Sequence, residues 1–209
     1  MMRIDTVASQ PDRAGRHTVR FADGSVMRLY RQTIEDFSIY PGNELSDDRM
    51  KELKKAAGAM SAKMRAVRIV AASNVSRKDL EQRLVQKGED PTQAKDAVRW
   101  MEELNLVDDR KTAEQIVHSC IRKGYGPGRA KQALYEKRIP KEYWEEALSD
   151  YPDQTDAIVA YLESHLLDPK DGKAVKKAID ALMRRGHSYS SVRKGLEQIS
   201  VETEDFPEG

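Results

Sequence analysis

One helical sequence motif occurs three times along this chain, and this repetition constrains the fold more than any other feature. Each copy ends in a basic residue followed by a turn residue, and the three turn residues are Gly88, Arg138 and Gly186. A leucine stands four positions before every turn residue: Leu84, Leu134 and Leu182. Successive turn residues are 50 and 48 residues apart, a spacing typical of stacked helical repeats. Because such arrays offer a long surface instead of an enclosed reaction chamber, the pattern favours a binding protein over an enzyme.

The first 45 residues are predicted to form a separate small β module. Residues 17–21 and 26–30 alternate apolar with polar side chains, and Asp23-Gly24 lies between them. Since glycine tolerates the positive φ of a tight turn, this arrangement is a strong β-hairpin signal. Residues 4–7 are expected to add a third strand, and no helical periodicity is evident before about residue 40.

From residue 46 onward the apolar side chains follow a helical period. Ser76 and Ser188 are expected to cap helices, and Asp90-Pro91 to begin one, because proline suits the first helical turn. The predicted segments are a connecting helix at 46–58, helical repeats at 59–106, 107–152 and 153–200, and a disordered acidic tail at 201–209. The first helix of repeat one should begin near Met60. We therefore expect a mainly α protein, with three tandem three-helix repeats in an elongated curved array behind the β module.

Lysine and arginine gather around the second helix of each predicted repeat, although the formal net charge is only +1. Acidic residues gather elsewhere, at 102–103, 142–146, 150–156 and in the tail. If equivalent helices stack, their cations form a basic stripe along one flank, and such a stripe favours an extended anionic partner. An ordinary solvated helical face is the alternative, and the charge pattern alone does not separate the two.

A glycine-rich turn is expected in the middle of repeat two, where residues 122–129 read Arg-Lys-Gly-Tyr-Gly-Pro-Gly-Arg. As a phosphate-binding loop this segment is weak, because no strand precedes it and the Gly-Lys-Ser/Thr ending is missing. Two compatible interpretations remain. The segment is either a tight turn between helices with Tyr125 packed over it, or a place where Tyr125 and the flanking cations contact a partner.

Several classes of protein are disfavoured by what the sequence lacks. A single cysteine, Cys120, cannot form an internal disulfide and favours a reducing cytosol. No apolar run approaches the roughly 18 residues of a membrane span, and the N-terminus has no apolar block of a secretory signal. The histidines are scattered without metal-ligand spacing, and no nucleophile with an evident base is found. We therefore expect a cytoplasmic monomer that is not an enzyme and uses no cofactor, metal or membrane.

The glycine-rich turn and its surroundings resemble the centre of RecX-type regulatory proteins. That centre typically has a basic residue, Gly-x-Gly-Pro, a second basic residue, a leucine and a Lys-Gly-Ile turn, and residues 122–140 follow this order. Residues 76–88 and 104–109 fit the preceding part of the family pattern, and residues 184–192 are similar to its third repeat. Two departures affect local packing. Arg138 replaces the usual glycine, and Lys111-Thr112 stands where an aromatic residue is expected before Ala113.

The resemblance implies a modulator of the RecA recombinase, active in homologous recombination, DNA repair and the SOS response. RecX-like proteins bind the RecA–single-stranded-DNA filament in its helical groove and restrain its growth, ATP hydrolysis and strand exchange. The residues that we expect to contact this partner are Arg122, Lys123, Tyr125, Arg129, Lys131 and Lys137, with Arg77, Lys87, Arg184 and Arg185 as outer contacts. A direct, sequence-tolerant DNA-binding protein of helix-turn-helix-like repeats is the alternative, and a general scaffold is a third class.

Overall fold

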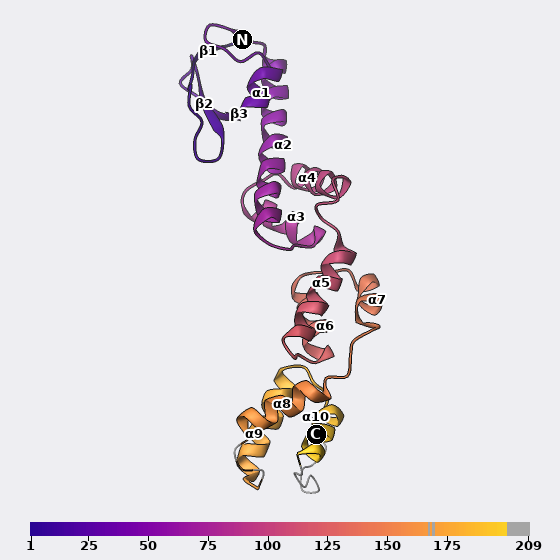
Figure 1. The fold of residues 1–209 in the computed structure, drawn as a ribbon. Helices are drawn as coiled ribbons and strands as arrows, with labels where there is room; N and C mark the ends of the chain where they lie inside the picture. The colour runs from indigo at the N-terminus through magenta and orange to yellow at the C-terminus, as the bar shows by residue number, and fades with distance from the viewer. Residues whose placement is uncertain (167, 169, 200–209) are drawn as a thin grey trace. The chain divides into compact units, whose positions relative to one another are not determined.

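The computed structural model describes residues 1–166, 168 and 170–199, and the chain divides into two compact units (Figure 1). The first unit is Met1–Val107, and the second begins at Asp108. A mainly helical protein with a small N-terminal sheet is what the sequence predicted, and the structure confirms this class. The acidic tail predicted at 201–209 lies outside the described residues.

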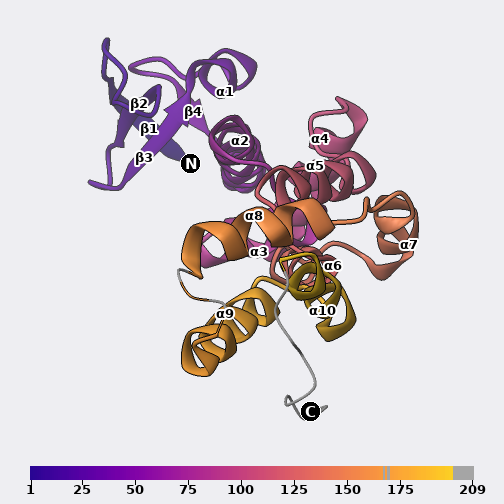
Figure 2. The same ribbon diagram turned by 60° about the horizontal axis from the view of Figure 1, so that its bottom comes forward.

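The first unit begins with a four-stranded antiparallel sheet in the order β3-β2-β1-β4. Its strands are β1 (Met2–Val7), β2 (Arg16–Phe21), β3 (Val26–Tyr30) and β4 (Glu44–Leu45). The predicted hairpin is confirmed, because Val19 of β2 lies opposite Met27 of β3 and Gly24 turns the chain with a φ of +83°. Figure 2 shows the strands beside α1 (Arg31–Asp36) and α2 (Asp47–Ala72), against which apolar side chains such as Ile4 and Leu29 are buried.

The helix α1 corrects the expectation that nothing before about residue 40 is helical. Six residues are too few for a 3.6-residue period of apolar side chains to show in the sequence. The helix is supported by local polar contacts instead, including the ion pair between Arg31 and Glu35 at 2.8 Å, a spacing that brings side chains together on a helix. A single apolar residue, Ile34, packs on the core of the sheet.

The helix α2 corrects a second expectation, because one continuous helix of 26 residues replaces the predicted connecting helix and the separate first helix of repeat one. Ser46 caps it, accepting a hydrogen bond from the Arg49 amide. Gly58 does not break the helix; a Cβ there would lie 2.3 Å from Oε1 of Gln93, so this glycine makes room for a side chain of another helix. Leu53 packs in the core of the sheet and Ala62 in the core of repeat one, so α2 belongs to both.

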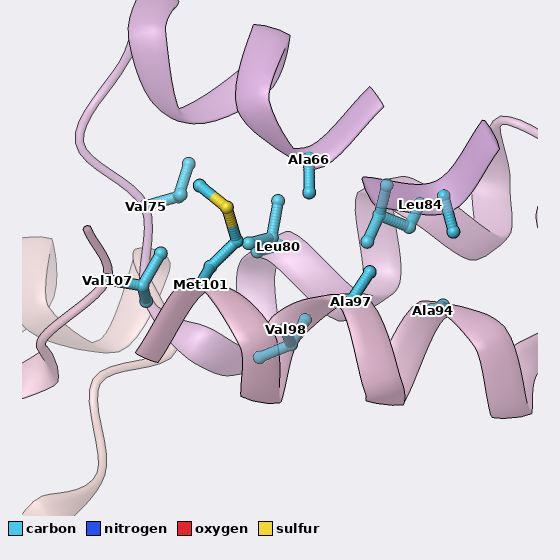
Figure 3. Close-up of a cluster of buried hydrophobic side chains, with 10 residues drawn as sticks. Ala66, Val75, Leu80, Leu84, Ala94, Ala97, Val98, Met101 and Val107 are labelled. Carbon is cyan, nitrogen blue, oxygen red and sulfur yellow. The ribbon is translucent and has the colours of Figure 1, made fainter. Parts of the chain in front are cut away.

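Repeat one is completed by α3 (Arg77–Gln86) and α4 (Pro91–Glu103), which pack on the second half of α2. Figure 3 shows the core between them, where Leu80 and Leu84 of α3 face Ala97 and Met101 of α4. The predicted helix starts are confirmed, since the Asp79 amide donates to Ser76 Oγ (3.1 Å) and Asp90 caps α4 with proline in its first turn. This packing depends on small residues, because alanines let the helices approach closely.

Repeats two and three form the second unit, and each has its own apolar core. Repeat two contains α5 (Asp109–Arg122), α6 (Pro127–Glu136), the 3₁₀ turn η1 (Lys141–Tyr143) and the short α7 (Trp144–Leu148). Repeat three contains α8 (Thr155–His165), α9 (Gly172–Arg184) and α10 (Tyr189–Gln198). The cap predicted at Ser188 is present, since its Oγ accepts a hydrogen bond from the Ser191 amide at 3.1 Å. Half of the expected partner-binding residues lie on α6 and α9 or directly after them: Arg129, Lys131, Lys137, Arg184 and Arg185.

Candidate partner-binding surface

The second helix of every repeat ends in the same turn. In repeat one the Gly88 amide donates to the Val85 carbonyl (2.9 Å) and the Glu89 amide to the Leu84 carbonyl (3.1 Å), which is the Schellman arrangement of a helix end. The corresponding bonds recur after α6 and α9. The turn residues Gly88, Arg138 and Gly186 all have positive φ, at 88°, 53° and 86°. Arg138 therefore takes the glycine conformation without being glycine.

Repeats two and three meet where residues 124–128 pack on residues 185–187, and we call this contact the joint. The Gly126 amide donates to the Arg185 carbonyl and the Gly128 amide to the Gly186 carbonyl, both at 3.0 Å. A Cβ on Gly186 would lie 2.0 Å from the Arg129 nitrogen, and one on Gly126 would lie 2.2 Å from the Gly186 oxygen. Glycine is needed on both sides because backbone lies directly against backbone. The glycine-rich turn is thus the element that orients repeat three on repeat two.

The Arg185 side chain also stabilises the joint. Its guanidinium lies 5.2 Å from the ring centroid of Tyr125 and 5.0 Å from that of Tyr161, within the range of cation–π attraction. Nη2 of the same side chain donates to the Lys123 carbonyl at 3.4 Å. Tyr125 and Arg185 were both expected to contact a partner. The structure places them, half-buried, against one another, so the packed-tyrosine interpretation of the turn fits this geometry.

His187 is a further side chain that links the two sides of the joint. Its side chain is 4% exposed, and its Nε2 lies 3.1 Å from the Gly124 carbonyl. Because a carbonyl only accepts hydrogen bonds, Nε2 must carry the hydrogen and donate it. Burial lowers the pKa of His187, the Arg185 charge lowers it further, and the hydrogen bond to Gly124 acts in the opposite direction. The joint therefore favours the neutral form of the His187 imidazole.

The other expected contact residues fall into two groups. Some cations are engaged within the fold: Arg77 with Glu102 at 3.0 Å and Arg129 with Glu136 at 3.1 Å. Lys137 is half-buried at the end of α6. The remaining side chains are exposed and, within the described residues, form no ion pair: Lys87, Arg122, Lys123, Lys131 and Arg184. The exposed group is the part of the predicted set that is free to meet an anionic partner.

A groove of about 700 Å³ lies between α6 and the end of α9 in the second unit. It brings together Arg129 and Arg184 from the expected set. Gln132 and Glu136 line it from α6, and Met183 lines it from α9. Within this unit the cationic second helices thus share one surface depression, which the repeat spacing alone could not locate.

Two exposed apolar side chains of this surface were missed by sequence reasoning. Tyr135 is 72% exposed and Met183 is 43% exposed, although apolar side chains at helical spacing are normally read as core. Lys173, Lys176 and Lys177 form, with Arg184, an exposed cationic face of α9. The signal that could have found Tyr135 and Met183 is their common place in the repeat, three residues before the turn residue.

The described residues show no grouping of three or more histidine, cysteine, aspartate or glutamate side chains that could hold a metal ion. None of the described helices combines the length and the apolar character needed to cross a membrane. Cys120 is buried in the core of repeat two, and burial raises the pKa of its thiol.

Comparisons with known proteins agree on one family. Residues 108–148, from α5 to α7, match the model of the RecX second three-helix domain. The regulatory protein RecX of Chlorobaculum tepidum is 31% identical over 153 residues, which cover 72% of this chain and 92% of that protein. The Vibrio parahaemolyticus RecX is 27% identical over 155 residues, covering 73% of this chain and 98% of the relative.

Solved structures show the same fold. A crystal structure of a regulatory protein RecX has a TM-score of 0.65 at 18% identity and covers 92% of this chain and 98% of that one. RecX from Lactobacillus salivarius has a TM-score of 0.60 at 20% identity and covers 70% of this chain and 99% of that one. Together with the sequence identity to the Chlorobaculum protein, these findings show that the chain belongs to the RecX family of regulatory proteins.

Proposed function

We propose that this protein regulates a RecA recombinase by binding the filament that RecA forms on single-stranded DNA. Binding restrains growth of the filament, its ATP hydrolysis and strand exchange. The observation that carries the proposal is family membership, because the similarity to a RecX protein extends over 153 residues and 92% of that relative. A cytoplasmic monomer is the form in which we expect the chain to act.

The second unit offers a physical basis for such binding. Its exposed cations lie on repeats that the joint holds together, so the Arg122, Lys131 and Arg184 side chains belong to one body. Several weak contacts made by one body raise the overall affinity far above that of any single contact. A nucleoprotein filament, with its regular and largely anionic surface, is a target for which this arrangement is suited.

The proposal is tested by titrating the full-length protein into RecA assembled on single-stranded DNA and measuring ATP hydrolysis. We expect turnover to fall at ratios well below one molecule per RecA subunit, because blocking growth at a few positions affects a whole filament. Unchanged turnover across the titration contradicts the proposed function.

A double charge reversal, Arg122→Glu with Lys123→Glu, tests the basic surface. Both side chains are exposed at the end of α5, so the helices should remain intact by circular dichroism. The concentration needed for half-inhibition should rise about tenfold, since reversed charges repel an anionic partner. Lys54→Glu with Lys55→Glu is the matched control, because these adjacent lysines are also exposed but lie on the first half of α2. Equal inhibition by both double variants would contradict a role for Arg122 and Lys123.

Direct binding to DNA is the second candidate function, and the cationic face of α9 is the observation that favours it. Lys173, Lys176 and Lys177 are exposed there and, as far as the described residues extend, make no ion pair. Phosphate binding by such lysines gives an affinity that falls steeply with salt. A steep salt dependence on naked DNA, with no preference for RecA-coated DNA, would favour this candidate over filament regulation.

A further inference from the structure

Exposed apolar side chains recur at one position of the helical repeat. From Asp108 through the described residues of the second unit, the large hydrophobic side chains that remain exposed are Tyr135 and Met183. Each stands three residues before its turn residue, Arg138 or Gly186. Val85 occupies the same position before Gly88 in repeat one and is 39% exposed. Single exposed apolar residues are normal on protein surfaces, but recurrence at an equivalent position in every repeat needs a cause.

The fold itself does not require an apolar side chain at this position. The helix end requires only the backbone carbonyl at this position, which accepts the amide hydrogen of the turn residue, as in Gly88 to Val85 at 2.9 Å. The buried apolar residue of each turn is the leucine one position earlier: Leu84, Leu134 and Leu182. A polar side chain would therefore serve the turn equally well, and would be better hydrated.

In the second unit this position lies at the α6–α9 groove. Met183 lines the groove from α9. Tyr135 is not a lining residue, but it stands three residues after the lining residue Gln132, so Gln132 and Tyr135 are neighbours on the surface of α6. The Arg129–Glu136 ion pair is internally neutralised at 3.1 Å. Arg184, which also lines the groove, makes no ion pair with any described residue. The groove thus places the apolar side chain of Met183 beside an uncompensated positive charge, and Tyr135 directly precedes its lining residue Glu136.

We propose that Val85, Tyr135 and Met183 are the apolar contacts through which each repeat binds a protein surface on which apolar side chains are flanked by carboxylates. Tyrosine, methionine and arginine are enriched where proteins meet, and the free charge of Arg184 complements a carboxylate. Because Glu136 neutralises Arg129, the uncompensated charge in the groove lining is that of Arg184, and a single positive charge beside an apolar side chain favours a protein over nucleic acid as the occupant. A partner built from identical subunits repeats its own surface, as the chain repeats this contact. The inference rests on the proposed function, in which that partner is the RecA protein of the filament.

The test replaces the contacts by glutamine, which is polar and forms helices well. Tyr135→Gln with Met183→Gln should raise the concentration needed for half-inhibition of the RecA ATPase at least about tenfold, as expected for truncating interface anchors. Adding Val85→Gln should raise it further. Affinity for a naked single-stranded oligonucleotide should stay unchanged, because phosphate contacts do not use these side chains.

The control is Tyr40→Gln, since Tyr40 is an exposed tyrosine (56%) outside the repeats; it should inhibit like the wild type. Binding of each protein to RecA filaments is also measured directly. If the wild type neither binds nor inhibits, the proposed function fails and this inference fails with it. If the wild type acts and the double variant acts equally well, only the inference is overturned.

A parallel loss of affinity for naked DNA would also overturn it, because the side chains would then contact nucleotides, for example by stacking on bases. Circular dichroism of each variant verifies the helices. If the double variant loses helical signal, Tyr135→Gln and Met183→Gln are measured singly, and each should weaken inhibition by a smaller factor. Full inhibition by both folded single variants would contradict the inference.

Discussion

The interior of a helical repeat and the joint between repeats two and three are held together by different kinds of contact. Inside repeat two, Ala130 and Leu134 of α6 are fully buried against apolar side chains of α5. At the joint no apolar cluster is shared, because the cores of the two repeats contain different residues. Backbone hydrogen bonds, one guanidinium between two tyrosines and one imidazole connect them instead. The interior should therefore set stability, whereas the joint should set the orientation of repeat three.

The largest effect is expected from Leu134→Ala in the interior. Leu134 is fully buried, and removing its side chain leaves a cavity, so the free energy of unfolding should fall by about 2–5 kcal/mol. Urea denaturation followed by circular dichroism measures this change. Gln132→Ala, at an exposed position on the same helix, is the control and should change stability little. A loss below that seen for the joint variants would contradict the division between interior and joint.

The next largest effect is expected from Gly186→Ala in the joint, and Gly88→Ala is its matched control. Both glycines have nearly the same positive φ, 86° and 88°, so alanine costs about 1–2 kcal/mol at either position from backbone strain. At Gly88 a Cβ meets nothing within 4 Å, but at Gly186 it lies 2.0 Å from the Arg129 nitrogen. Gly186→Ala should therefore lose about 1 kcal/mol more than Gly88→Ala, the lower end of the cost of overpacking. Equal losses in the two variants would show that the joint is not closely packed in solution.

Acid should weaken the joint through His187. Because burial lowers the pKa of His187 in the folded protein below its ordinary value of 6.5, the unfolded chain takes up the proton first as pH falls. Stability is then fully present above pH 6.5 and is lost as pH falls from there through the lowered folded pKa. Unfolding free energies measured between pH 7 and about 5, where most carboxylates remain ionised, should decline in the wild type. His187→Gln should flatten that decline, and an unchanged slope in the variant would assign the effect to another group.

The same contrast explains which features could be predicted from the sequence. The β2–β3 hairpin and the caps at Ser76 and Ser188 follow from residues close together in the chain, and these predictions are confirmed. The need for glycine at position 58 of α2 comes from the Gln93 side chain, and the need for glycine at position 126 comes from the Gly186 backbone. Such contacts between distant segments leave no periodic signal.

The candidate site shows the same limit. Tyr125 follows a cation-rich helix and Tyr135 belongs to another; the sequence placed Tyr125 among the expected contacts, left open whether it packs over the turn or meets a partner, and did not single out Tyr135. In the structure Arg185, sixty residues away in the chain, lies over the Tyr125 ring at 5.2 Å, while Tyr135 is 72% exposed. Burial of a residue beside a turn depends on what packs there. Only the repeated position before each turn residue carried information about Tyr135.

The smallest effect is expected from Arg138→Gly. The turn of Arg138, unlike that of Gly186, does not belong to the joint, so this variant changes backbone strain without changing the packing of the joint. Arg138 has a φ of 53°, a conformation that costs a residue with a Cβ about 1–2 kcal/mol. Glycine removes this strain but makes the unfolded chain more flexible, at a cost of about 0.4–1 kcal/mol. The difference is a net gain of somewhat less than about 1 kcal/mol, seen as a higher midpoint of thermal unfolding. Arg138→Ala removes the same side-chain contacts without relieving the backbone. The glycine variant should therefore be more stable than the alanine variant, and the reverse order would show that the turn after α6 carries no strain.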